Sequence, residues 1–188
     1  MESAFLIMTF LIALYSVLAL FDGVFLHLYK YKLHENPESK FEHLTHTVRA
    51  FLFSGILLTL FINIDTNRFF YLGIFLLGLD VLVLILDAYS EKDSRKFMGG
   101  LPRWEYILHL LVNGFHFASI AVFLVLKVKL SGNGMLLVTH FESIKNYHIF
   151  KTVAVNLLPG SLLISLLHIL VYFPKLNSRF KKLKFSCC

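Results

Sequence analysis

Residues 3–21 contain no charged side chain, and the apolar stretch that they begin continues to about residue 29. A bilayer span needs about 20 consecutive, mainly apolar residues, so this segment is long enough to cross a membrane. Four further segments of the same kind follow, at about residues 45–64, 69–89, 106–126 and 152–173. Their length, and the absence of a strict alternation of apolar and polar residues, favour helices over a barrel. The sequence therefore predicts an all-α integral membrane bundle of five transmembrane helices, a single domain over residues 1–188.

The composition excludes several other classes of protein. Hydrophobic residues make up 57% of the 188 residues and charged residues only 16%, which argues against a disordered chain and against an ordinary soluble domain. Five spans leave no room for a separate soluble catalytic domain, so any chemistry must lie among the helices. Cys187 and Cys188 are adjacent, and they can form neither a disulfide framework nor a spaced metal site.

The basic residues predict one orientation in the membrane. The segments 28–44, 90–104 and the tail after residue 173 together hold twelve Lys and Arg residues, including Arg95, whereas the opposite side holds five. The positive-inside rule then places the N-terminus outside and the C-terminus in the cytoplasm of a multi-pass cell-membrane protein. The net charge of +6 is attributed to this topology and to contact with anionic lipids, so we expect membrane lipids as partners and no nucleic acid. The early residues lack the basic region of a cleaved signal peptide.

A short motif occurs twice. Residues 41–46 and 104–109 each read aromatic, Glu, three residues, His, and each copy follows a proline and a basic loop. This similarity predicts an internal repeat of residues 3–64 and 69–126, in which the first four helices form two repeated hairpins around a polar site. An axis along the membrane normal would relate the two halves, and their polar residues would lie at one depth, near the cytoplasmic face.

Ionisable residues within spans are costly, and they usually face the bundle interior and mark a functional site. Glu and His four residues apart lie on one helical face, and Asp87 and Glu91 have the same spacing. In its ligands the pattern is similar to the di-iron and di-manganese carboxylate bundles, with Glu-x3-His in place of Glu-x2-His. The predicted metal ligands are His27, Glu42, His46, Asp87, Glu91, Glu105 and His109.

Asp22 and Asp80 are the candidate catalytic carboxylates. Asp22 and His27 are five residues apart, about 140° around a regular helix, and a π-bulge near Gly23 would bring them onto one face. Without such a bulge, Asp22 could instead pair with Arg49. Asp80 lies near mid-span and is expected to serve as a proton path or as a partner of a ligand.

Other polar residues have weaker assignments. His43, His116 and His168 are secondary candidates for the site, for which hydrogen-bonded packing is an equal alternative. The remaining histidines are expected in solvated loops, and several lysines are expected to anchor the chain at the membrane interface. Those histidines are His34, His140 and His148, and those lysines are Lys127, Lys129 and the ones in residues 180–185.

Carboxylate and imidazole ligands without thiolate suit iron, manganese or zinc. The leading hypothesis is a membrane metalloprotein with a mononuclear or dinuclear centre, iron favoured, that acts as an oxidoreductase on a lipophilic small molecule. The alternatives are a zinc-dependent membrane lipid hydrolase, a transporter of protons or divalent cations, bis-histidine haem ligation, and a purely structural membrane protein. The outer halves of the spans are nearly apolar, which argues against a transport path. The sequence does not determine an oligomeric state.

Overall fold

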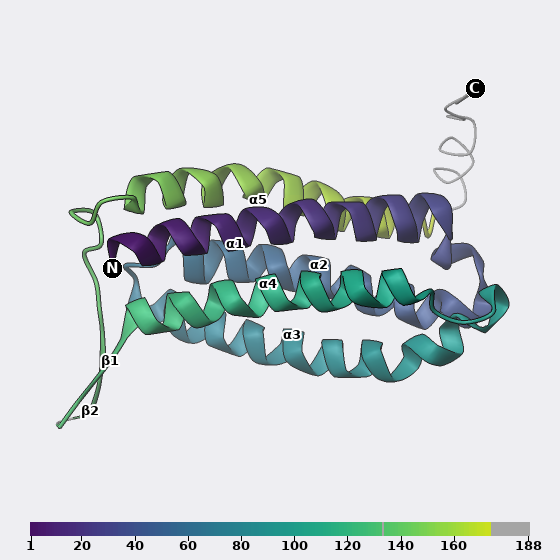
Figure 1. The fold of residues 1–188 in the computed structure, drawn as a ribbon, viewed down its shortest axis with the longest axis horizontal. Helices are drawn as coiled ribbons and strands as arrows, with labels where there is room; N and C mark the ends of the chain where they lie inside the picture. Colours follow the sequence, from purple (N-terminus) through teal and green to yellow (C-terminus); the bar gives the residue numbers. More distant parts are fainter. Residues whose placement is uncertain (133, 174–188) are drawn as a thin grey trace.

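The computed structural model describes residues 1–132 and 134–173, and helices account for most of them (Figure 1). Five helices are long and apolar enough to cross a membrane, as the sequence predicts. Their bounds are α1 (Glu2–Leu20), α2 (Lys40–Ile56), α3 (Asn67–Ser94), α4 (Arg103–Lys127) and α5 (Tyr147–Leu170). Two π-helices prolong them, Phe21–Lys30 after α1 and Leu57–Ile62 after α2.

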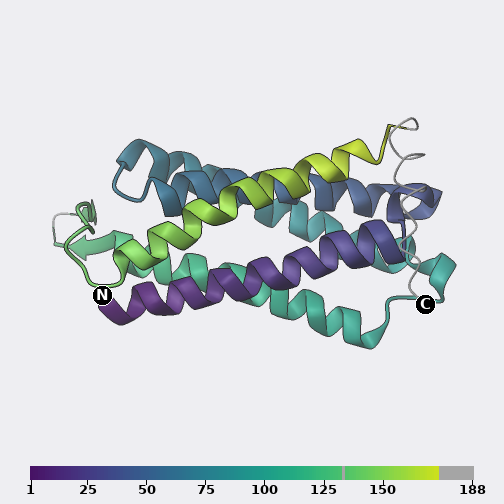
Figure 2. The ribbon, with the colours of Figure 1, turned by 90° about the horizontal axis from the view of Figure 1, so that it is seen from above.

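The helices do not pack as two separate hairpins. α1 packs against α4, α2 packs against α3, and α5 lies across both α1 and α2 (Figure 2). α3 and α4 make little contact with each other. The first four helices nevertheless carry their polar residues to the same end of the bundle, so the two Glu-x3-His motifs can meet there. The common origin of the two halves stays a prediction.

The two ends of the bundle have different interiors. At the end that holds the N-terminus, the core consists of tightly packed aromatic rings, such as those of Phe5, Phe61, Phe123 and Phe150. The other end, where α1 and α3 finish and α2 and α4 begin, holds the ionisable side chains and is called the polar end below. Large apolar side chains are exposed along the helices, as expected of surfaces that face lipid.

A small β-hairpin follows α4, and the sequence did not predict it. Strands β1 (Val128–Ser131) and β2 (Gly134–Leu137) pair antiparallel and project sideways at the N-terminal end of the bundle (Figure 1). Lys127 is not an exposed interface anchor there, which corrects the expectation from the sequence. Its side chain is buried, and its Nζ donates a hydrogen bond of 2.8 Å to the carbonyl of Val138.

Helix limits differ from the sequence expectation at the polar end. α3 continues to Ser94 and α4 begins at Arg103, so the loop between them is short, a 3-10 turn at Lys96–Met98 and the segment after it. The loop before α2 contains two further 3-10 turns, Leu33–Glu35 and Pro37–Ser39. The predictions about Cys187, Cys188 and residues 180–185 lie outside the described residues.

Candidate metal centre

The π-helix at the end of α1 brings Asp22 and His27 together. Its hydrogen bonds join residues five apart, for example from the amide of Tyr31 to the carbonyl of Leu26 at 2.8 Å. Residues at that separation therefore share a face, and His27 Nε2 lies 3.3 Å from Asp22 Oδ1. The local distortion expected near Gly23 is present, and the alternative pairing of Asp22 with Arg49 is wrong.

His109 on α4 completes this group. Its Nε2 lies 3.2 Å from the same Asp22 Oδ1, and its Nδ1 lies 2.7 Å from Glu91 Oε1 on α3. A carboxylate behind one ring nitrogen fixes the orientation of the imidazole and leaves the other nitrogen to bind an ion. Asp22, His27, Glu105 and His109 each offer one donor atom, and all four atoms lie within 4.8 Å of one another.

These separations fit ligands of one ion. Donor atoms held about 2.0–2.1 Å from a metal at the tetrahedral angle are about 3.3 Å apart. The two printed separations from Asp22 Oδ1, 3.3 Å to His27 and 3.2 Å to His109, match that value. The third separation, between the nitrogens of His27 and His109, is within 4.8 Å, so the three donor atoms lie close enough together to bind one ion.

His46 forms a neighbouring group on α2. Its Nε2 lies 3.3 Å from Asp87 Oδ2, and its ring is 4.1 Å from that of His27, centroid to centroid. The hydroxyl of Thr45 donates to Asp87 Oδ1 at 2.5 Å, which holds that carboxylate in place. His27, Glu42 and His46 also have donor atoms within 4.8 Å of one another. All seven predicted ligands thus lie in one polar cluster; their role as ligands stays a prediction.

Arg95 is the residue that sequence reasoning missed. The sequence places it among the basic residues of a cytoplasmic loop, but its side chain is fully buried at the end of α3. One guanidinium nitrogen, Nη2, lies 2.6 Å from Glu42 Oε1 and 2.8 Å from Glu105 Oε1. The two glutamates of the repeated motif therefore share an arginine between them. The sequence does indicate this position, because Asp87, Glu91 and Arg95 follow one another at intervals of four residues. Arg95 therefore lies on the same helical face as two of the predicted ligands.

The surroundings of Arg95 are polar on one side and aromatic on the other. Nη2 also lies 3.2 Å from His27 Nε2, a contact that His27 must give up if that nitrogen binds an ion. The hydroxyl of Ser94 donates to Glu42, and the ring of Tyr31 lies 5.2 Å from the guanidinium carbon. Desolvation raises the pKa of the Tyr31 hydroxyl above its ordinary value, so this residue stays neutral.

Asp80 belongs to a different network, farther into the bundle. Its Oδ1 accepts a hydrogen bond of 3.1 Å from Arg49 Nε, and its Oδ2 lies 3.2 Å from His116 Nε2. Arg49 also donates to Asn113, whose amide in turn donates to the carbonyl of His109. Asp80 and His116 are thus joined to each other rather than to the predicted ligands, and their catalytic or ligand roles stay predictions.

His43 contacts residues at the end of α5 instead of the cluster, and His168 lies on α5 itself. His43 Nδ1 lies 2.7 Å from the hydroxyl of Tyr172, and its ring stacks on that of His168 at 5.1 Å. The ring of His34 packs 5.6 Å from that of His43, and its side chain is only 5% exposed. The expectation of a solvated loop histidine is therefore wrong for His34, while His140 and His148 are exposed.

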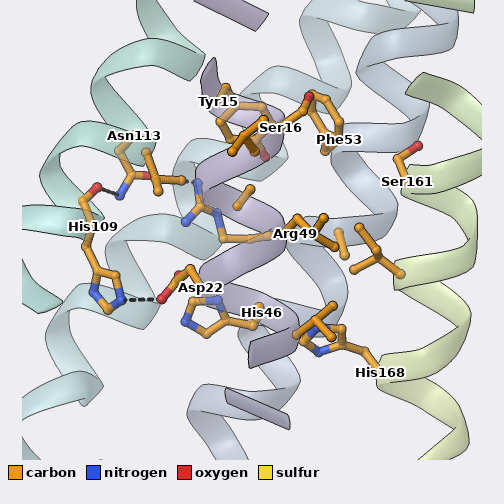
Figure 3. Close-up of a pocket in the computed structure, with 18 of the residues that line it drawn as sticks. Tyr15, Ser16, Asp22, His46, Arg49, Phe53, His109, Asn113, Ser161 and His168 are labelled. Carbon is orange, nitrogen blue, oxygen red and sulfur yellow. Dashed lines mark hydrogen bonds and ion pairs between the residues drawn. The ribbon is translucent and has the colours of Figure 1, made fainter. Parts of the chain in front are cut away.

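A cavity of about 710 Å³ adjoins the cluster, and every one of the five helices contributes to its walls. Asp22, His46 and His109 lie at one end of it, with Arg49 and Asn113 deeper inside (Figure 3). The other walls are mainly apolar, and the α5 side includes Ser161 and His168. Comparison of the chain with protein-family models, with curated proteins and with solved structures gave no match.

Proposed function

We propose that this chain is a multi-pass membrane metalloprotein whose centre is mononuclear and is ligated by Asp22, His27 and His109. The observation that carries the proposal is that one carboxylate oxygen lies 3.3 Å and 3.2 Å from two imidazole nitrogens. Glu91 contacts the other ring nitrogen of His109, Nδ1, and so holds the orientation of the imidazole. Carboxylates commonly hold metal-binding histidines in this way.

A second metal is not part of the proposal. The position between Glu42 and Glu105, where a second ion would lie in a carboxylate-bridged pair, is taken by the guanidinium of Arg95. A cation already balances these two carboxylates, so no bridging ion is needed between them.

Two histidines and one carboxylate with open positions are the ligand set of non-haem Fe(II) enzymes, so iron is the favoured metal. Bound iron would supply oxidative chemistry to a lipophilic substrate in the adjoining cavity, and the protein would act as an oxidoreductase. Zinc also uses three protein ligands with one open position. A zinc hydrolase would need a general base as well, but the neighbouring carboxylates are held by His109, by Thr45 and His46, or by Arg95.

The aromatic core supports an enclosed site over a transport path. Beyond the cavity, toward the end with the N-terminus, the bundle interior is filled by rings including those of Phe5, Phe61 and Phe150. A path for protons or cations would need polar groups through that half.

Elemental analysis tests the proposal. Protein purified without added metal, or reconstituted with iron, should hold about one ion per chain. Asp22→Asn and His109→Ala should each abolish most of this binding, whereas His148→Ala, which changes an exposed histidine at the start of α5, should not. A folded wild-type protein that resists loading with iron, manganese and zinc would overturn the proposal.

The proposed orientation has its own test. The test uses a background in which Cys187 and Cys188 are replaced by Ser. If the polar end faces the cytoplasm, a cysteine in place of Lys92 should react only with reagents that reach that side, and one in place of Lys145 only with reagents outside. The reverse labelling pattern would place the centre near the outer face.

A further inference from the structure

The lining of the cavity reaches the lipid-facing surface at α3 and α4. Leu84 and Ala88 on α3 and Tyr106 and Leu110 on α4 line it, and these two helices make little contact. Tyr106 and Leu110 are themselves more than half exposed, on the surface that a bilayer would cover. A hydrophobic molecule dissolved in the membrane could therefore pass between α3 and α4 and reach His109 without crossing water.

The charges around the cavity select against an anionic headgroup. Asp22, Asp87 and Glu91 all line its polar end. The arginine that lines it, Arg49, is neutralised by Asp80 at 3.1 Å. In the metal-free protein, a phosphate or carboxylate placed here would meet like charges in a region of low dielectric constant. A neutral hydroxyl or carbonyl group has no such penalty, and it can still bind the remaining N–H groups of Arg49 or the hydroxyl of Tyr15.

The size of the cavity limits the rest of the molecule. At about 30 Å³ for a water-sized group, a volume of 710 Å³ holds roughly two dozen such groups. That volume matches one alkyl or isoprenoid chain with a small head. The mainly apolar walls suit the chain, and the polar end suits the head.

We propose that the cavity binds a single-chain neutral lipid headed by a hydroxyl or carbonyl group, which enters between α3 and α4 with its head toward His109. This inference rests on the proposed function for the role of the lipid as a substrate; the binding itself depends only on the cavity. A long-chain alcohol or aldehyde and a short-chain quinone share the required chemistry.

Photolabelling in nanodiscs tests the proposal, with hexadecanol that carries a diazirine on its chain as the probe. Unlabelled hexadecanol, or a short-chain quinone, should compete with the probe. The stronger competitor shows whether the cavity prefers a long-chain alcohol or a quinone. On chelator-treated protein, hexadecanoate, with the same chain and a negative head, should compete at least about tenfold less well. Equal competition by hexadecanoate, or failure of both neutral competitors, would overturn the proposal.

Two glycine variants provide a matched pair. A Cβ at Gly160, which lines the cavity on α5, or at Gly78, which does not line it, meets no atom within 4 Å. Gly160→Leu should fill part of the cavity and lower labelling by about tenfold, whereas Gly78→Leu should leave it within about twofold. Equal labelling of the two variants would contradict binding in this cavity.

The same samples separate this inference from the metal centre. Gly160→Leu should keep the metal content of the wild type, since no proposed ligand is changed. Chelator-treated wild-type protein should still be labelled by the probe, because the apolar walls and the α3–α4 opening remain. Loss of labelling in metal-free, folded protein would show that the lipid site does not exist apart from the centre, and would overturn the inference as stated.

Discussion

Two groups of carboxylates lie side by side at the polar end, and they differ in what balances their charge. Glu42 and Glu105 are fully buried and share Arg95, with contacts of 2.6 Å and 2.8 Å. Asp22 and Glu91 line the cavity and contact His109 instead. The first group is a closed ion cluster made entirely of side chains, whereas the second consists of metal-binding residue types beside an open space.

The difference shows why similar motifs need not have similar roles. The two Glu-x3-His motifs look equivalent in the sequence. In the structure their glutamates both contact Arg95, whereas His46 contacts Asp87 and His109 contacts Asp22 and Glu91. A buried charge must be compensated: Arg95 does this for Glu42 and Glu105, whereas among the described residues the carboxylates of Asp22 and Glu91 have only histidine side chains as partners. The open cluster is therefore the place where an external cation gains most.

The largest expected effect comes from breaking the closed cluster. Arg95→Met leaves Glu42 and Glu105 facing each other without a cation, and it should lower the free energy of unfolding by about 3–5 kcal/mol. Thermal or denaturant unfolding in detergent measures this. Arg103→Met, which changes an exposed arginine at the same end, is the control and should have little effect. An equally mild effect of both substitutions would show that Arg95 does not balance the glutamates.

Asp80→Asn should cause the next largest loss of stability. It removes the charge that accepts from Arg49 and faces His116, and hydrogen bonds to charged groups contribute about 1.5–3 kcal/mol. The same unfolding measurement should show a loss of that size, and elemental analysis should show unchanged metal content. A loss of metal together with unchanged stability would instead show that Asp80 contributes to metal binding.

Glu91→Gln tests the open cluster without removing a ligand. In the wild type, Glu91 Oε1 lies 2.7 Å from His109 Nδ1. The substitution weakens this contact, which orients the imidazole, and it should lower metal affinity by about 10–100-fold. Competition with a chelator of known affinity measures the change. Asp93→Asn, which changes an exposed carboxylate two residues further on, should leave the affinity unchanged. If both variants bind metal like the wild type, Glu91 does not position a ligand.

The smallest effect is expected at the α5 side. Tyr172→Phe removes the hydroxyl that lies 2.7 Å from His43 Nδ1, which should lower the free energy of unfolding by about 1 kcal/mol. Metal content should not change, because His43 faces away from the cluster. Loss of metal in this variant would extend the centre toward His43 and His168.

The five spans, and the gathering of ionisable residues at one end, followed from the sequence alone. Apolar runs of bilayer length leave little choice other than helices, because backbone groups in lipid must bond within their own segment. The spacing of Glu42 with His46, and of Glu105 with His109, then placed each pair on one helical face. Even the distortion at Gly23 could be anticipated from the need to bring Asp22 toward His27.

Which groups contact each other was decided only by the tertiary structure. Helical periodicity gives the face of a residue on its own helix, but the neighbours of that face depend on how helices pack, and here α1 meets α4 while α2 meets α3. For that reason Arg95, assigned to a loop by its charge, lies buried between two glutamates. The cavity has the same origin, because all five helices contribute to its walls and its volume depends on how they are spaced, not on the pattern of any one helix.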